Sequence, residues 1–290
     1  MKLKYINKIK ASISIYTSIK SKNILEGTYK SVYKGKSMNF ENLREYVIND
    51  DVKDIDWKSS ARSGMLYVKQ FIAEKKHNIL FVMDTGKKMM ADTDLLESKK
   101  DIALYSMGTI GYISLKNGDC IGMIYQNTNN IQYKSFRFNL YNLEEYLCDY
   151  EKNYNNCDCN LNELLDYIYK KIHKKMVIVI ITDIAGIESI NINTLKNLKY
   201  QNDVLVINIG DNNMMGNNVF DVYDEKYIPS FLLNDSILNR IEINIKDKLL
   251  KENTYKFKKC GVGMQSISSL SEINYKITKL LEDNKYANRK

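Results

Sequence analysis

The chain has 290 residues, of which 44% are hydrophobic and 27% charged, and its formal net charge is +8. With one proline and 13 glycines, this composition is that of a globular protein with a sizeable core and argues against a long disordered tail. The lysines are spread along the chain, which favours a solvated basic surface over a patch for an anionic partner, and we expect no nucleic-acid partner.

Cysteine and histidine are too sparse for a framework of disulfides or a histidine-rich metal site. Cys157 and Cys159 lie one residue apart, which is too close for the usual paired zinc ligands. His77 and His173 are the only histidines, so a catalytic triad would need one of them. We expect reduced thiols and a cytoplasmic protein. The longest apolar run, 176–181, is far shorter than the ~20 residues of a membrane helix, and no signal peptide is evident.

The first element is predicted over residues 3–20, within an N-terminal segment 1–25. Apolar side chains recur there near helical spacing, with lysines between them: Leu3, Ile6, Ile9, Ile13, Tyr16 and Ile19. Such a basic amphipathic helix packs against its own domain or a partner, or else lies on a membrane surface. The first alternative is favoured by its modest amphipathicity.

A block dense in charged and aromatic residues follows at 26–76, with a strand expected at 65–71 and a charged turn at 74–76. From 77 to 290 strands alternate with helices. Strands are expected at 77–83, 120–125, 131–136, 176–181, 204–209, 219–223 and 261–267. Helices are expected at 95–116, 142–151, 161–174, 193–200, 235–255 and 271–282. Continuously apolar strands between helices predict a doubly wound, mostly parallel sheet, with 131–136 as its antiparallel edge.

Two of these strands end in a carboxylate, Asp84 and Asp183. Ligands of doubly wound sheets gather at the carboxyl ends of the strands, so the pair could hold a divalent cation. The alternative is that each aspartate caps the turn or helix that follows its strand.

A long string in the charged block carries a family resemblance. Residues 38–46 read MNFENLREY, residues 49–62 read NDDVKDIDWKSSAR, and Tyr67-Val68-Lys69 follow. This string resembles the signature of the bacterial domain-of-unknown-function family 58 (DUF58), whose members carry a von Willebrand factor A-like domain. The resemblance extends over roughly 26–282 and implies that α/β fold, with an N-terminal helix and a small charged and aromatic extension.

The resemblance also implies a degenerate metal-ion-dependent adhesion site. Such sites use D-x-S-x-S after the first strand, a later threonine and a late aspartate. Here the first motif reads Asp84-Thr85-Gly86-Lys87-Lys88, so Asp84 is kept and both serines are replaced. The threonine position falls near Cys159, and Asp183 matches the late aspartate.

The loss of both hydroxyls disfavours Mg²⁺, which requires near-octahedral oxygen coordination. A lysine ammonium at ~4 Å would repel the cation by several kcal/mol. We therefore predict no cofactor, with Lys88 or Lys87 neutralising Asp84 and Asp183. The alternative is that both lysines point into water and a weak metal site persists.

The signature block has three interpretations. Arginines could pair with aspartates while Trp57 and Tyr46 pin the block to the sheet; the block could be a partner surface; or its carboxylates could perform acid/base hydrolysis. The residues concerned are Leu43, Arg44, Glu45, Tyr46, Asp50, Asp51, Asp54, Asp56, Trp57, Arg62 and Lys69.

The resemblance implies a non-enzymatic interaction or adaptor module that acts with a MoxR-type AAA+ ATPase in the assembly or maturation of other proteins. Two rival hypotheses remain. One is a metal-dependent hydrolase built on Asp50, Asp51, Asp54 and Asp56. The other is a scaffold that touches the membrane surface through the N-terminal helix.

Overall fold

The computed structural model describes residues 3–19, 24–33, 39–48, 50–72, 76–128, 130–153, 159–212, 219–221, 226–228 and 235–287. It divides into two compact units, the larger one formed by Met1–Val32 with Asn78–Lys290 and the smaller one by Tyr33–His77. The smaller unit is thus an insertion in the larger one. Cys157, signature residues 38 and 49, and residues 74–75 of the predicted turn lie outside the described ranges.

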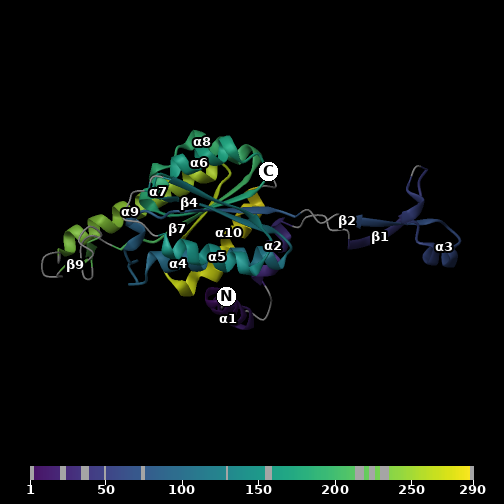
Figure 1. The fold of residues 1–290 in the computed structure, drawn as a ribbon, viewed down its shortest axis with the longest axis horizontal. Coiled ribbons are helices and arrows are strands. Elements are labelled where there is room, and N and C mark those ends of the chain that lie inside the picture. The colour runs from purple at the N-terminus through teal and green to yellow at the C-terminus, as the bar shows by residue number, and fades with distance from the viewer. Residues whose placement is uncertain are drawn as a thin grey trace. The chain divides into compact units, whose positions relative to one another are not determined.

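A six-stranded sheet forms the centre of the larger unit (Figure 1). Its strand order is β10-β7-β6-β3-β4-β5, and all neighbouring pairs are parallel except β4 with β5. The predicted mostly parallel sheet and its antiparallel edge are confirmed. The strands are β3 (Asn78–Met83), β4 (Cys120–Asn127), β5 (Asn130–Arg137), β6 (Val177–Asp183), β7 (Asp203–Ile209) and β10 (Gly263–Ile267).

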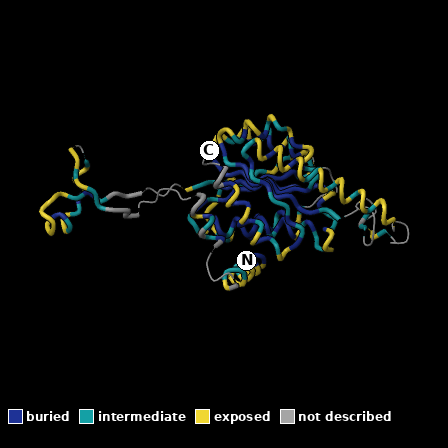
Figure 2. Tube along the Cα trace, turned by 180° about the vertical axis from the view of Figure 1, so that it is seen from behind, coloured by how far each residue is buried: buried dark blue, intermediate teal, exposed yellow. Residues whose placement is uncertain are grey.

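Helices cover both faces of this sheet (Figure 1). One layer contains α1 (Lys4–Ile19), α4 (Lys99–Lys116), α5 (Leu140–Lys152) and α10 (Ile273–Ala287). The other contains α6 (Leu161–Lys171), α7 (Ile184–Ser189), α8 (Ile192–Gln201) and α9 (Ser236–Lys259). The sheet is buried between these two layers (Figure 2), which is why its central strands are apolar on both faces.

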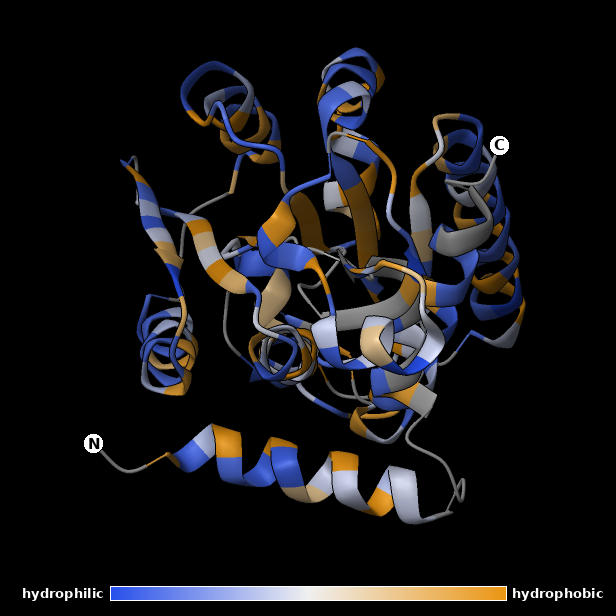
Figure 3. Cartoon of the chain, turned by 90° about the vertical axis from the view of Figure 1, so that its right-hand side faces the viewer, coloured by the Kyte–Doolittle hydropathy of each residue, from blue (hydrophilic) through white to orange (hydrophobic). Residues whose placement is uncertain are grey.

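The N-terminal helix α1 packs on its own unit. Tyr5, Ile6 and Ile9 are buried where it lies against α4 and α5. Hydrophobic and hydrophilic residues alternate along this helix (Figure 3). The buried Glu144 of α5 accepts hydrogen bonds from the backbone N–H groups of Tyr5 and Ile6, at 2.8 and 3.0 Å. A carboxylate at a helix N-terminus is stabilised by the helix dipole and by the unpaired N–H groups there.

A second helix, α2 (Ile24–Tyr33), was not predicted. Leu25 and Tyr29 are buried in the larger unit, and the Tyr29 hydroxyl donates to Asp119 at 2.6 Å. These contacts place the start of the 26–76 segment in the larger unit, so the insertion begins later, at Tyr33.

Among the described residues, no helix is both long and apolar enough to cross a membrane.

The smaller unit is an antiparallel pair of strands with a short helix. Strand β1 (Asn39–Glu45) pairs with β2 (Tyr67–Ile72), and α3 (Trp57–Ser63) lies between them in sequence. The Asp56 side chain caps α3, and Gly64 ends it at φ 74°, a left-handed conformation that favours glycine. The predicted strand 65–71 corresponds to β2. The predicted strand 219–223 is described only as β8 (Phe220–Asp221), paired with β9 (Lys226–Tyr227).

Candidate functional site

The two predicted aspartates meet at the carboxyl edge of the sheet. Asp84 follows β3 and Asp183 ends β6, and these strands are adjacent and parallel. The Asp84 N–H donates to the Ile181 carbonyl at 3.1 Å. This edge is the point where the strand order reverses, since β4 lies on one side of β3 and β6 on the other. Asp84 is 6% exposed and Asp183 2%.

Asp84 is held by groups that donate to its carboxylate. The Gly86 N–H donates to Oδ1 at 2.8 Å, and the Thr182 hydroxyl donates to Oδ2 at 2.6 Å. The Cys159 thiol is a further hydrogen-bond partner. Burial raises the pKa of Asp84, and the negative charge of Asp183 also raises it, whereas the donors oppose the rise.

Cys159 lies beside Asp84, where the resemblance implied a site residue. A Cβ atom at Gly86 would lie 3.1 Å from both the Cys159 backbone nitrogen and Asp84 Oδ1, so the glycine allows this close approach. Burial, together with the Asp84 charge, raises the pKa of the Cys159 thiol to about 12. This shift disfavours the thiolate, which is the nucleophilic form of cysteine.

The amine that neutralises this site is Lys99. Its Nζ lies 3.3 Å from Asp183 Oδ2 and contacts Asp211 Oδ1, and the lysine side chain is 2% exposed. For Lys88, the prediction is wrong. Lys88 is exposed and contributes only its backbone carbonyl, which accepts from Lys99 Nζ at 3.2 Å. Burial lowers the pKa of Lys99, and Asp183 opposes that shift.

Asp183 also caps the helix that follows it, as the capping alternative predicted. Its Oδ1 accepts from the Gly186 N–H at 2.9 Å, at the start of α7. One carboxylate thus receives a helix N–H and a lysine ammonium at once. Both are donors, so neither oxygen remains without a partner.

The hydroxyl of Thr85 is engaged in a hydrogen bond within the protein. Its Oγ1 donates to the Gln126 carbonyl at 2.5 Å, at the end of β4. The Tyr150 hydroxyl donates to the Asp84 carbonyl at 3.0 Å, which fixes the same loop from α5. These bonds hold the loop after β3 in one conformation.

The residues present do not fit the metal that such domains hold. Gly86 has no side-chain ligand, the hydroxyls of Thr85 and Thr182 are engaged in protein hydrogen bonds, and Lys99 supplies positive charge. Across the part of the chain that the structure describes, no three His, Cys, Asp or Glu residues are arranged to hold a metal ion.

In the smaller unit the predicted arginine–aspartate pairing holds for Arg44. Its guanidinium donates to both carboxylate oxygens of Asp50, at 2.7 and 2.6 Å, and Asp50 also accepts from the Val47 N–H at 2.8 Å. The Arg44 donors hold the pKa of Asp50 below its usual value. Asp51 accepts from the Lys53 N–H at 3.0 Å, and Asp56 caps α3. These carboxylates therefore have local structural roles.

The other signature residues differ in exposure. Leu43, Tyr46, Asp54 and Lys69 are half-buried, and Glu45, Trp57 and Arg62 are exposed. Trp57 is 62% exposed and is not part of the core of its own unit. Its predicted packing against the sheet of the larger unit stays a prediction. For Arg62, no ion pair is formed within the described ranges.

Sequence reasoning missed Lys99, Thr182, Gly186 and Asp211. Lys99 had a usable signal, because it falls on the buried side of α4 together with Ile102, Ala103 and Ser106. A lysine at an i, i+3, i+4, i+7 position of a buried helix face requires an acidic partner. Asp211 lies in a polar stretch, where nothing distinguishes it from its neighbours.

The sequence model of the family described as "Protein of unknown function DUF58" matches residues 42–216. The chain belongs to this family. The match runs from the signature block to beyond β7 and so takes in both units. An uncharacterized protein of Mycobacterium tuberculosis is 26% identical over 104 residues, which are 36% of this DUF58 chain and 32% of that protein. The chain thus aligns with about a third of its curated relative.

Solved structures similar to this DUF58 chain include BatB and a von Willebrand factor type A protein. BatB from Bacteroides thetaiotaomicron is 13% identical with a TM-score of 0.44, covering 74% of this chain and 100% of that one. A von Willebrand factor type A protein from Catenulispora acidiphila is 8% identical with a TM-score of 0.42, covering 72% and 43%. The larger unit has the von Willebrand factor A-like fold, as its strand order and antiparallel edge require.

Proposed function

We propose that this DUF58 chain is a non-enzymatic protein-interaction module that binds a MoxR-type AAA+ ATPase in the cytoplasm and takes part in the assembly or maturation of other proteins. One observation carries the proposal. The smaller unit exposes large apolar side chains along its signature block: Val47, Ile48, Val52, Trp57, Met65 and Leu66, each at least 46% exposed.

These side chains form the signature surface. Among the residues of the smaller unit whose burial the structure describes, Ile55, Ser60 and Val68 are buried, whereas these six are exposed. Exposed apolar groups on a small unit mark a binding surface, and tryptophan is a preferred anchor of protein interfaces. An apolar surface also gains free energy when a partner removes it from water.

The signature surface is held in shape by polar contacts. The two-pronged Arg44–Asp50 pair fixes the loop that carries Val47 and Ile48, and the Asp56 cap fixes the start of α3, where Trp57 lies. A surface ordered before binding loses less conformational entropy when the partner arrives. This order favours recognition of a protein partner.

The edge of the larger unit adds a second argument. Lys99 neutralises Asp183 and Asp211, so partner binding through this edge would not require a divalent cation.

The rival hydrolase hypothesis is weakened because Asp50, Asp51 and Asp56 are engaged in ion-pair, turn and cap contacts. Titration calorimetry with Mg²⁺ and Mn²⁺ separates the two: heat that disappears in a D54N/D56N variant would support the hydrolase.

The test is capture of the purified MoxR-type ATPase of the same organism by the immobilised full chain. Trp57→Ala should weaken capture by about tenfold, as expected for an interface anchor. Tyr200→Ala is the matched control, because Tyr200 is 90% exposed on α8 of the larger unit. No capture by the wild-type chain, or equal loss in both variants, would contradict the proposal.

A further inference from the structure

Helix α9 presents aliphatic side chains to solvent over its N-terminal half. Its C-terminal half anchors the helix, since Asn253 and Phe257 are buried there. The N-terminal half extends beyond the end of the sheet and is largely exposed (Figure 1, Figure 2). Spacings of three and four residues place four aliphatic side chains on one side of this half. They are each at least 45% exposed and form the α9 stripe: Ile237, Leu238, Ile241 and Ile245.

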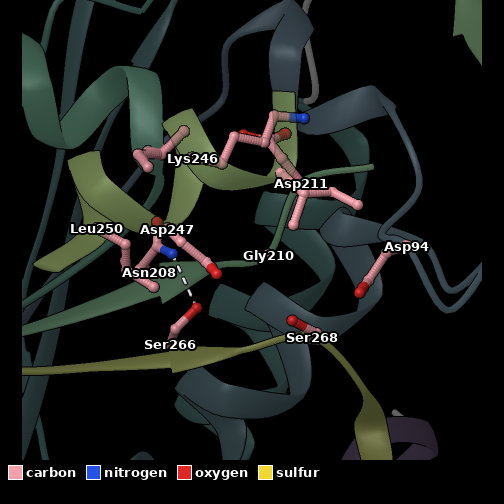
Figure 4. A pocket seen from close by; sticks show the side chains of 11 residues that line it. Asp94, Asn208, Gly210, Asp211, Lys246, Asp247, Leu250, Ser266 and Ser268 are labelled. Atoms are coloured by element: carbon pink, nitrogen blue, oxygen red, sulfur yellow. Dashed lines mark hydrogen bonds between the residues drawn. The ribbon is translucent and has the colours of Figure 1, made fainter. Parts of the chain in front are cut away.

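The opposite side of the same half faces the larger unit and is mostly polar. Glu242 and Lys246 are half-buried and pair at 2.6 Å, and Lys246 also donates to the Asn212 carbonyl at 2.6 Å. Lys246 and Leu250 line a pocket at the ends of β7 and β10 (Figure 4), and Ile243 lines it as well. Polar contacts on the inside and aliphatic groups on the outside invert the usual arrangement of a surface helix. The α9 stripe therefore marks a binding surface.

The first turn of the α9 stripe is ordered by a helix cap. The Asp235 carboxylate accepts from the N–H groups of Ile237 and Leu238, at 2.9 and 3.1 Å. This cap keeps the helix intact up to its exposed end. A surface that is already helical loses less conformational entropy when it binds.

Basic side chains border the α9 stripe. Lys248 continues it by one turn, and Arg240 and Lys251 lie along one edge of it. All three are exposed, and none forms an ion pair with the residues that the structure describes. Of the exposed acids nearby, Asp247 lies on the pocket side and Glu252 lies beyond the end of the stripe. An aliphatic stripe with a basic border is typical of a helix that lies on an anionic membrane surface.

We propose that α9 docks the larger unit on the surface of a membrane that contains anionic phospholipids. The α9 stripe enters the boundary between headgroups and acyl chains, and the three basic side chains reach the headgroup phosphates. The net charge of +8 attracts the chain to the same surface.

Two other occupants fit the α9 stripe less well. A protein interface is usually anchored by Trp, Tyr or Arg, and the stripe contains none of them. A second copy of the chain would bring another charge of +8 to the same place. The N-terminal helix α1 is in turn a poorer membrane element than α9, because its Tyr5, Ile6 and Ile9 are buried against its own unit.

Co-sedimentation of the full chain with lipid vesicles tests the inference. One set of vesicles contains equal parts of phosphatidylglycerol and phosphatidylcholine, and the other contains phosphatidylcholine alone. The wild type should bind the anionic vesicles at least about tenfold more tightly than the neutral ones. Ile241→Gln should weaken binding to the anionic vesicles about fivefold or more, because it removes apolar surface from the stripe. Ile243→Gln, the same substitution on the pocket side of α9, should leave binding within about twofold of the wild type.

Several results would overturn the inference. One is no binding by the wild type, and another is an equal effect of both isoleucine substitutions. A third is loss of binding in R240Q/K248Q/K251Q while Ile241→Gln binds normally, because basic charge alone would then hold the vesicles. A larger loss in Ile15→Gln, at an exposed position of α1, would assign the contact to α1. A wild-type dimer that Ile241→Gln dissociates in sedimentation equilibrium would show that a second copy covers the stripe.

The substituted positions are exposed, so circular dichroism should show an unchanged fold in each variant. The inference is independent of the proposed ATPase interaction. Trp57→Ala should bind vesicles as the wild type does, and Ile241→Gln should capture the ATPase as the wild type does. The two proposals therefore fail separately.

Discussion

The Thr182 hydroxyl donates to Asp84 Oδ2 over 2.6 Å and joins the ends of the neighbouring strands β6 and β3. Both side chains are buried, so the bond is shielded from competing water. The Thr182 hydroxyl is thus engaged in a hydrogen bond within the protein. The carboxyl edge of the sheet is thereby stabilised by side-chain contacts, and Lys99 completes them.

Lys99 should be essential for stability. Lys99→Met leaves the buried Asp183 and the half-buried Asp211 without their cation, and loss of one partner of a buried ion pair costs about 3–5 kcal/mol. Urea unfolding followed by circular dichroism measures this loss. Lys88→Met, at an exposed position, should change the free energy of unfolding by less than about 0.5 kcal/mol. Similar losses in both variants would contradict the assignment of the amine.

Gly186→Ala should destabilise the chain although alanine is the better helix former. A Cβ atom at Gly186 would collide with Thr182 Oγ1 and lie 3.1 Å from Asp84 Oδ2. Crowding of this kind costs about 1–3 kcal/mol, more than the ~1 kcal/mol that alanine gains in a helix. Thermal unfolding should show a lower Tm for Gly186→Ala but not for Glu188→Ala, at an exposed position of the same helix. A higher Tm for Gly186→Ala would be the contrary result.

Stability should depend on pH through Asp84. Because burial raises its pKa in the folded state above the usual 3.8, its favourable contribution is complete below that value. The contribution is lost as pH rises through the raised pKa, by at most about 1.4 kcal/mol per pH unit. Asp84→Asn should remove this dependence, so the free energy of unfolding of the wild type relative to this variant should fall as the pH rises above about 4.

Urea unfolding at several pH values in that range provides the measurement. Asp166→Asn, at a half-exposed position on α6, is the control and should keep the pH dependence of the wild type. A wild-type advantage over Asp84→Asn that grows with pH would show that the pKa of Asp84 is lowered instead.

Glu144 should hold α1 in place. Glu144→Gln removes the charge that accepts the Tyr5 and Ile6 N–H groups, and loss of a buried charge-assisted hydrogen bond costs about 1.5–3 kcal/mol. Hydrogen exchange of these two amides should become at least roughly tenfold faster, since 1.4 kcal/mol corresponds to a factor of ten. Glu145→Gln is the neighbouring control at an exposed position. Unchanged exchange in Glu144→Gln would show that apolar packing alone holds α1.

The architecture of the larger unit was predictable because its signals are local and repeated. Apolar runs such as 176–181 define central strands, and parallel strands bring their carboxyl ends to one edge. The approach of Asp84 to Asp183 follows from that rule alone. The amine was not predictable by the same route, because Lys99 reaches the site through the packing of α4, far from either aspartate in sequence. Lys88 lies closer in sequence but points into water.

The smaller unit was predictable only in part. Its signature string identified the family, and β2 corresponds to the strand expected at 65–71. Strand β1 and helix α3 were missed because their residues are mostly polar. Helix α3 depends on its caps, Asp56 and Gly64, and β1 is held by the Arg44–Asp50 pair. The exposure of Trp57 also runs against the preference of large aromatic side chains for burial.

The insertion of the smaller unit between Val32 and Asn78 separates two kinds of sequence change. Strands β3 to β10 follow one another without it, so substitutions around Trp57 change the proposed signature surface and leave the residues of the sheet unchanged. Conversely, the sheet can acquire a more stable core without disturbing recognition. Such modularity lets a single scaffold diversify its partners by exchanging one contiguous stretch of about 45 residues.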